Sequence, residues 1–86
     1  MKTAMAGTLE SMDCLITVTE GIPGSGVVIE LDGSSAVRFA TAIKNTITTT
    51  LDSLKVTDVS VLVNDHGALD VVLAARVETA VRRMRG

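Results

Sequence analysis

Ala6-Gly7-Thr8-Leu9-Glu10-Ser11-Met12-Asp13 leads directly into Cys14-Leu15-Ile16-Thr17-Val18 near the start of this 86-residue chain. The second segment alternates apolar and β-branched residues with a period of two, which predicts a half-buried strand. Residues 3–9 alternate more weakly and predict a second strand, so that Glu10 to Asp13 form a hairpin turn. We expect this turn to hold the Ser11 hydroxyl in water between two acids.

Two further strands are predicted along the chain. Three glycines and the only proline make residues 21–26 a loop. Val27-Val28-Ile29-Glu30-Leu31 follows as a third strand. Val59, Val61 and Val63 alternate with more polar residues and predict a fourth.

Two segments have apolar residues at spacings of three and four, which predict helices with one apolar face. Ser34 and Ser35 offer a hydroxyl N-cap to the first helix. Asp70 lies in the first turn of the second, and a cluster of arginines (Arg76, Arg82, Arg83 and Arg85) is expected near its end, as the helix dipole favours. The two apolar faces comprise Ala36, Ala40, Ile43, Ile47, Leu51 and Leu54, then Leu69, Val72, Leu73, Val77, Ala80, Val81 and Met84.

The element order is therefore β-β-β-α-β-α, without repeats or a linker. This order indicates the α/β (α+β) class, as a two-layer sandwich with a mostly antiparallel four-stranded sheet and two helices on one face. Residues 1–86 are expected to form a single domain, because a chain of this length has room for one core.

Composition excludes several classes of function. A hydrophobic fraction of 47% argues against disorder. A net charge of −2 argues against nucleic-acid binding, which requires clustered cations. No apolar run approaches the roughly 20 residues of a membrane helix. The single cysteine and the lack of a secretion signal after Lys2 favour the cytoplasm.

Few residues suggest bond chemistry. His66 is the only histidine, and nearby Asp65 and Asp70 suit a turn and a helix start, so no metal site is predicted. Cys14 shares a strand face with Ile16 and is expected to be buried rather than nucleophilic. No catalytic residue is therefore predicted, and the glycine-rich loop lacks the Gly-Lys-Ser/Thr ending that binds phosphates.

Three segments carry a family resemblance. Residues 6–11, Val63-Asn64-Asp65-His66-Gly67-Ala68-Leu69-Asp70 and Ala75-Arg76-Val77-Glu78 together resemble the acyl carrier protein, or gamma subunit, of citrate lyase. In that family the serine of a Gly-Thr/Ser-Leu-Glu-Ser motif carries a phosphoribosyl-dephospho-coenzyme A group. Ser11 occupies this position, with Glu10, Met12 and Asp13 as its neighbours in the turn. Met12 replaces the small residue expected there.

The resemblance implies a non-catalytic carrier whose arm holds acetyl and citryl thioesters while citrate is cleaved to acetate and oxaloacetate. The implied partners are the alpha (transferase) and beta (lyase) subunits of citrate lyase and a prosthetic-group transferase. Glu10 and Asp13 would repel the anionic arm and help to hold it away from the body.

Three alternatives stay open. The first is the related carrier subunit of malonate decarboxylase, which uses the same type of arm. The second is an unmodified interaction or regulatory domain with an open sheet face. The third is an ordinary pantetheine carrier, because Asp52-Ser53-Leu54 matches the attachment motif of all-helical acyl carrier proteins. Ser53, however, is predicted in the last turn of a helix rather than at the start of one.

Overall fold

The computed structural model describes residues 1–33 and 36–86. The N-cap predicted at Ser34 and Ser35 therefore lies outside the described residues. The order β-β-β-α-β-α is confirmed. The elements are β1 (Thr3–Gly7), β2 (Cys14–Glu20), β3 (Val27–Asp32), α1 (Ala36–Ser53), β4 (Val59–Asp65) and α2 (Asp70–Arg85).

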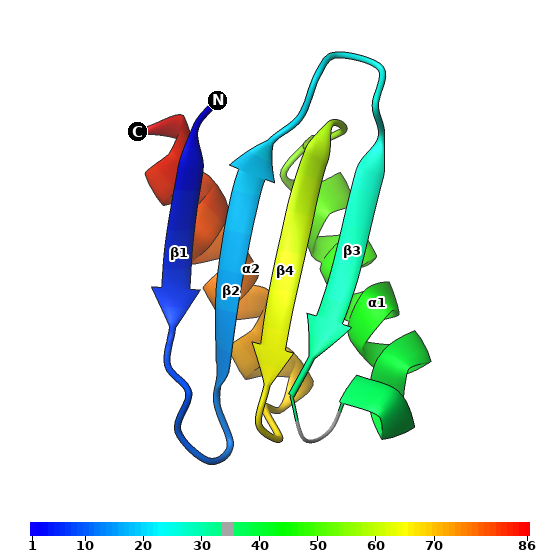
Figure 1. Ribbon diagram of the computed structural model, residues 1–86, viewed down its shortest axis with the longest axis vertical. Coiled ribbons are helices and arrows are strands. Elements are labelled where there is room, and N and C mark those ends of the chain that lie inside the picture. The colour runs from blue at the N-terminus through cyan, green and yellow to red at the C-terminus, as the bar shows by residue number, and fades with distance from the viewer. Residues whose placement is uncertain (34–35) are drawn as a thin grey trace.

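The four strands form one sheet in the order β1-β2-β4-β3 (Figure 1). The β1–β2 and β2–β4 pairs are antiparallel, and β3 lies parallel to β4. The mostly antiparallel sheet is thus confirmed. The parallel pair arises because α1 connects β3 to β4 and returns the chain to the same end of the sheet.

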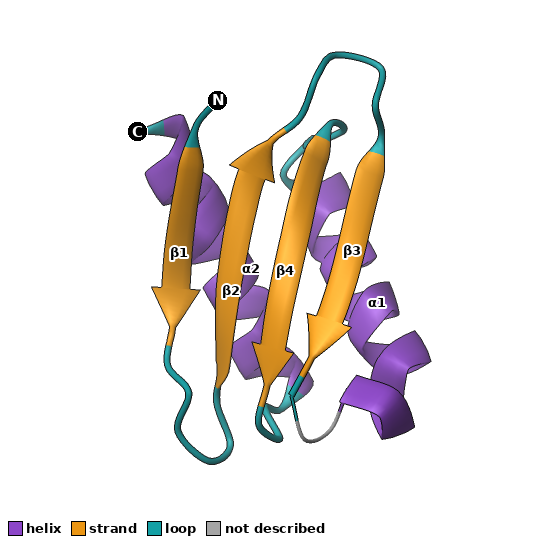
Figure 2. Cartoon of the chain, viewed as in Figure 1, coloured by secondary structure: helices purple, strands orange, loops and turns teal. Residues whose placement is uncertain are grey.

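Both helices cover the same face of the sheet (Figure 2). The alternation of β2 and β4 directs Ile16, Val18, Val61 and Val63 into the core, where none of them is exposed to solvent. The helices contribute the residues predicted from their spacing, with Ile47 and Leu51 from α1, and Leu73, Val77 and Val81 from α2. In the described part of the chain, no helix is both long and apolar enough to cross a membrane.

Some predicted boundaries need correction. β1 ends at Gly7 rather than Leu9, because Gly7 has a φ of +106° and a β-carbon there would overlap the carbonyl oxygen of Cys14. Leu69 is not part of the buried helical face: it precedes α2, with 60% of its surface exposed. The backbone of Phe39 is non-helical (φ −116°, ψ 21°) and produces a kink in α1 that the spacing did not predict.

Candidate functional site

Ser11 lies exposed at the tip of the β1–β2 hairpin. The amide of Asp13 donates to the carbonyl of Glu10 over 3.2 Å and closes a turn with Ser11 and Met12 at its centre. Met12 has a φ of +66°, a conformation that glycine or asparagine usually supplies at this position. Among the described residues, none forms a hydrogen bond with the Ser11 hydroxyl. This primary hydroxyl is therefore free to react.

The hairpin tip is joined to the connection between β4 and α2. The amide of Met12 donates to the carbonyl of His66 over 2.7 Å, and the amide of His66 donates to the carbonyl of Asp13 over 2.9 Å. The structure thus brings together two segments that are more than fifty residues apart in the sequence. The ends of β2 and β4 make this possible, because Cys14 pairs with Asp65 in the sheet.

Asp65 stabilises this second turn. Its side chain is buried, and its two carboxylate oxygens accept the amides of Gly67 (3.2 Å) and Ala68 (3.1 Å). The predicted role of Asp65 as a turn residue is confirmed. Asp70 is the first residue of α2, but the N-cap position belongs to Leu69, which offers no side-chain cap.

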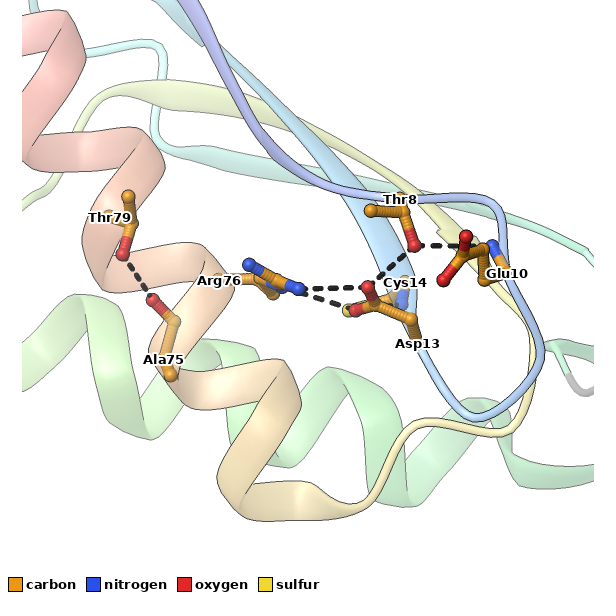
Figure 3. Close-up of polar contacts among 7 residues, drawn as sticks. All are labelled: Thr8, Glu10, Asp13, Cys14, Ala75, Arg76 and Thr79. Atoms are coloured by element: carbon orange, nitrogen blue, oxygen red, sulfur yellow. Dashed lines mark hydrogen bonds and ion pairs between the residues drawn. The ribbon is translucent and has the colours of Figure 1, made fainter.

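Asp13 forms a polar cluster that supports the hairpin from the side (Figure 3). Its Oδ1 accepts the amide of Cys14 (2.7 Å) and Nε of Arg76 (3.1 Å). Its Oδ2 accepts Oγ1 of Thr8 (2.6 Å) and Nη2 of Arg76 (2.8 Å). The hydrogen bonds from Arg76, then those from Thr8 and the Cys14 amide, hold the pKa of the Asp13 carboxyl well below its usual range.

The predicted position of Arg76 near the end of the second helix is wrong. Arg76 lies in the middle of α2, and only the other three arginines occupy the last turn. Asp13 was expected to repel an anionic group on Ser11, but its ion pair with Arg76 offsets that repulsion. Glu10 is the exposed acid of the turn, and it forms no ion pair with the residues that the structure describes. Sequence spacing had no signal for the contact between Arg76 and Asp13, because it joins positions 63 residues apart.

Cys14 is confirmed as a buried, apolar residue. It has no exposed surface, and burial, followed by the nearby charges of Asp13 and Asp65, raises the pKa of its thiol to about 11. A thiol with such a pKa is almost fully protonated at neutral pH and is a weak nucleophile. Among the described residues, no three His, Cys, Asp or Glu side chains are grouped as metal ligands.

Ser53 is the last residue of α1, as predicted, and its Oγ donates to the carbonyl of Thr50 over 2.7 Å. It does not lie beside Ser11, because α1 ends at the opposite end of the sheet from the hairpin tip (Figure 1). Ser53 also belongs to a sheet-containing fold rather than to an all-helical bundle. These positions give Ser11 the better geometry for a modification.

Comparisons with known proteins agree in the type of protein they identify. A family model described as "Malonate decarboxylase delta subunit (MdcD)" matches residues 1–84. The citrate lyase acyl carrier proteins of Weissella paramesenteroides and Leuconostoc citreum are 46% and 48% identical over 82 residues, which cover 95% of this chain and 82% of each relative. That of Treponema denticola is 39% identical over 80 residues, or 93% of this chain and 88% of the relative.

A solved structure shares the fold. It is the crystal structure of a Pseudomonas malonate decarboxylase hetero-tetramer in complex with malonate. One of its chains matches with a TM-score of 0.73 and 22% identity, over 96% of this chain and 84% of that chain.

Proposed function

We propose that this chain is the acyl carrier subunit of a citrate lyase. The chain belongs to the family of acyl carrier subunits that contains the citrate lyase acyl carrier protein and the malonate decarboxylase delta subunit. The curated relatives named citrate lyase acyl carrier protein support the proposal, since they align with nearly the whole chain at up to 48% identity. Residues 1–86 would act as one acyl-carrier domain. A single cluster of buried side chains from both helices and the sheet supports this extent.

The observation that carries the proposal is the exposed hydroxyl of Ser11 at the tip of a firmly held hairpin. Phosphoribosyl-dephospho-coenzyme A would be attached there through a phosphodiester. The position fits this group, because an anion is readily accommodated at a solvent-exposed turn. When bound, the group supplies a thiol that holds acetyl and citryl units as thioesters.

The chain's own contribution is to position the arm rather than to catalyse. Backbone hydrogen bonds to His66 and the Asp13–Arg76 ion pair fix the base of the arm. A group held in this way reaches its partners at a high effective concentration. We assign the bond chemistry to the alpha (transferase) and beta (lyase) subunits, and attachment of the arm to a prosthetic-group transferase. All of these would act in the cytoplasm.

The test is the intact mass and ultraviolet spectrum of the protein purified from a host that is fermenting citrate. The chain has no Trp or Tyr, so an adenine-containing arm would dominate the spectrum. We expect a mass increment on the peptide that contains Ser11, together with an adenine band. An increment on the Ser53 peptide without adenine would contradict the proposal in favour of a pantetheine carrier, and a bare chain would favour an unmodified interaction domain.

The second candidate is the carrier subunit of malonate decarboxylase. The description of the matching family model favours it. Reconstitution separates the two candidates: the modified chain is mixed with purified alpha and beta subunits of citrate lyase or with the other subunits of a malonate decarboxylase. Restored citrate cleavage supports the first candidate, whereas restored malonate decarboxylation alone supports the second.

A further inference from the structure

A groove lies at the end of the molecule that holds Ser11, between the first part of α1 and the connection from β4 to α2. Its volume is about 360 Å³, within the range of about 300–1,000 Å³ typical of small-molecule sites. Its apolar lining comes from both segments and consists of Phe39, Ala42, Ile43, Ala68 and Leu69.

Phe39 gives this groove a specific character. It is the only aromatic residue of the chain apart from His66, and half of its surface is exposed at the kink of α1. Leu69, on the facing wall, is 60% exposed. Neighbouring exposed apolar side chains beside a polar turn are typical of a contact site, and a solvent-facing aromatic ring can stack on a nucleobase.

The groove lies near the proposed attachment site. The hydrogen bond from the Met12 amide to the His66 carbonyl joins the hairpin to the connection. Ser11 immediately precedes Met12 in the chain. Gly67, which lines the groove, immediately follows His66. A group on Ser11 therefore begins near the groove.

We propose that the groove binds the adenine of the arm carried on Ser11, with Phe39 as its stacking partner. This inference rests on the proposed function. In an arm joined through its phosphoribosyl unit, the adenosine lies near the attached end and the thiol at the far end. Docking of the adenine therefore fixes the base of the arm and leaves the thiol-bearing portion free to move between partner subunits.

The attachment makes weak binding sufficient. A group on a short flexible linker has an effective concentration in the millimolar range. A dissociation constant of that order for the free nucleotide would keep the tethered adenine docked for about half of the time. The groove therefore does not need to bind the free nucleotide with a dissociation constant below the millimolar range.

The charges near the groove are mixed. The Arg38 guanidinium carbon lies 5.3 Å from the centroid of the Phe39 ring and can attract the phosphates of the arm. Asp65 and Asp70 also line the groove. The Asp65 oxygens accept two amides, whereas Asp70 is exposed and should disfavour phosphates close to α2. We therefore expect the phosphates to lie towards Arg38.

The test is an NMR titration of the unmodified chain with dephospho-coenzyme A. Apart from the imidazole of His66, Phe39 contributes the only aromatic side-chain signals of the protein, so its ring can be followed directly. We expect these signals and the amides of Gly67 and Ala68 to shift with a millimolar dissociation constant. Phosphopantetheine, which lacks adenine, should not shift them. In the modified chain, the same signals should already be shifted without added ligand.

Two variants make the test specific. Phe39→Ala should raise the dissociation constant about fivefold or more, as the loss of one base–aromatic stack does. Ile22→Ala removes an apolar side chain that is 71% exposed in the loop before β3, and it should bind as the wild type does. Because Phe39 is half exposed, its truncation should leave the fold intact, which the unchanged amide signals of β2 and β4 would verify.

Two results would overturn the groove assignment: no shift of Phe39 with millimolar dephospho-coenzyme A, or equal affinity in Phe39→Ala. A response of the groove to a purified transferase subunit but not to the nucleotide would also overturn it and assign this surface to a subunit interface. The titration tests only the groove. The mass of the Ser11 peptide tests the proposed function separately, so failure of one can be told from failure of the other.

Discussion

Ser11 combines an accessible hydroxyl with a supported backbone. The side chain is exposed and makes no hydrogen bond to the described residues, whereas the next residue, Met12, is held by the carbonyl of His66. Reactivity at this position therefore depends on the side chain, and the shape of the turn depends on its neighbours.

We predict that Ser11→Ala folds normally and cannot be modified. The Ser11 side chain is exposed and forms no hydrogen bond to the described residues, and substitution of such a turn residue changes the free energy of unfolding by less than about 0.5 kcal/mol. Chemical denaturation measures the stability, and intact mass after incubation with the prosthetic-group transferase measures the modification. Thr8→Ala is the informative comparison, because it removes a hydrogen bond to Asp13 but keeps the serine. An unfolded Ser11→Ala chain would show that the residue is structural.

Asp13 should make stability depend on pH in the acid range. Its folded pKa is depressed, first by Arg76 and then by Thr8, so the folded state favours the ionised carboxylate. The contribution is fully present above the unfolded pKa of about 3.9, and it is lost as the pH falls towards the folded pKa. The folding equilibrium constant should decrease by up to about tenfold per pH unit in this range because of this group.

Asp13→Asn tests this pH dependence. Denaturation measured between neutral pH and about pH 2 should show a shallower loss of stability than in the wild type below the unfolded pKa of about 3.9. The difference should shrink when both chains also carry Arg76→Gln, because Arg76 is the largest cause of the shift. Parallel pH profiles of the wild type and Asp13→Asn would contradict the assignment.

At the scale of elements, α2 supports the hairpin through Arg76. The guanidinium makes two hydrogen bonds to Asp13, and the same carboxylate accepts the Thr8 hydroxyl and the Cys14 amide on the two sides of the turn. We predict that Arg76→Gln lowers the melting temperature and slows modification of Ser11, because the tip becomes more mobile. Arg82→Gln is the matched control, since it breaks an ion pair with Glu78 whose side chains are 73% and 46% exposed.

Pairs as exposed as Arg82–Glu78 contribute about 0–1 kcal/mol, so the control should change neither measurement appreciably. Arg76→Lys keeps the charge but loses the two-pronged geometry, and it should recover only part of the modification rate. If the two glutamine variants were modified equally fast, the contact between α2 and Asp13 would have no positioning role.

Gly7 sets the point where β1 ends and the turn begins. With a φ of +106° and the Cys14 carbonyl in the place of a β-carbon, Gly7→Ala should be strongly destabilising. Gly24→Ala is a matched control: its φ is +88°, but a β-carbon there meets nothing within 4 Å. The control should cost about 1–2 kcal/mol from the backbone conformation alone, and Gly7→Ala clearly more. Equal costs in denaturation experiments would exclude the close approach as the cause.

The elements themselves were predictable because their signals are local. The valines at 59, 61 and 63 predict β4, and the three-and-four spacing predicts the buried Ile47 and Leu51 of α1, both confirmed. Strand order and the partner of Arg76 depend on contacts between distant segments, which no local period encodes. Ser11 could be selected only through the family resemblance, since an exposed turn serine has no distinctive pattern of its own.

At the scale of the whole molecule, the proposed attachment site lies apart from the buried core. The hairpin tip, the β4–α2 connection and the start of α1 lie at one end of the sheet (Figure 1). The helices bury one face of the sheet, and the other faces solvent (Figure 2). This arrangement suits a carrier that binds several partners, because partner proteins can bind at one end while the core stays rigid.

Adjacent residues of β4 test this division between faces. Val61 is fully buried under the helices, whereas Leu62 is 45% exposed on the open face. Although leucine loses more atoms on truncation, we predict that Val61→Ala lowers the free energy of unfolding by about 2 kcal/mol or more and Leu62→Ala by less than about 1 kcal/mol. Chemical denaturation at two protein concentrations measures both. A larger, concentration-dependent loss for Leu62→Ala would mean that a second copy of the chain covers the open face in solution.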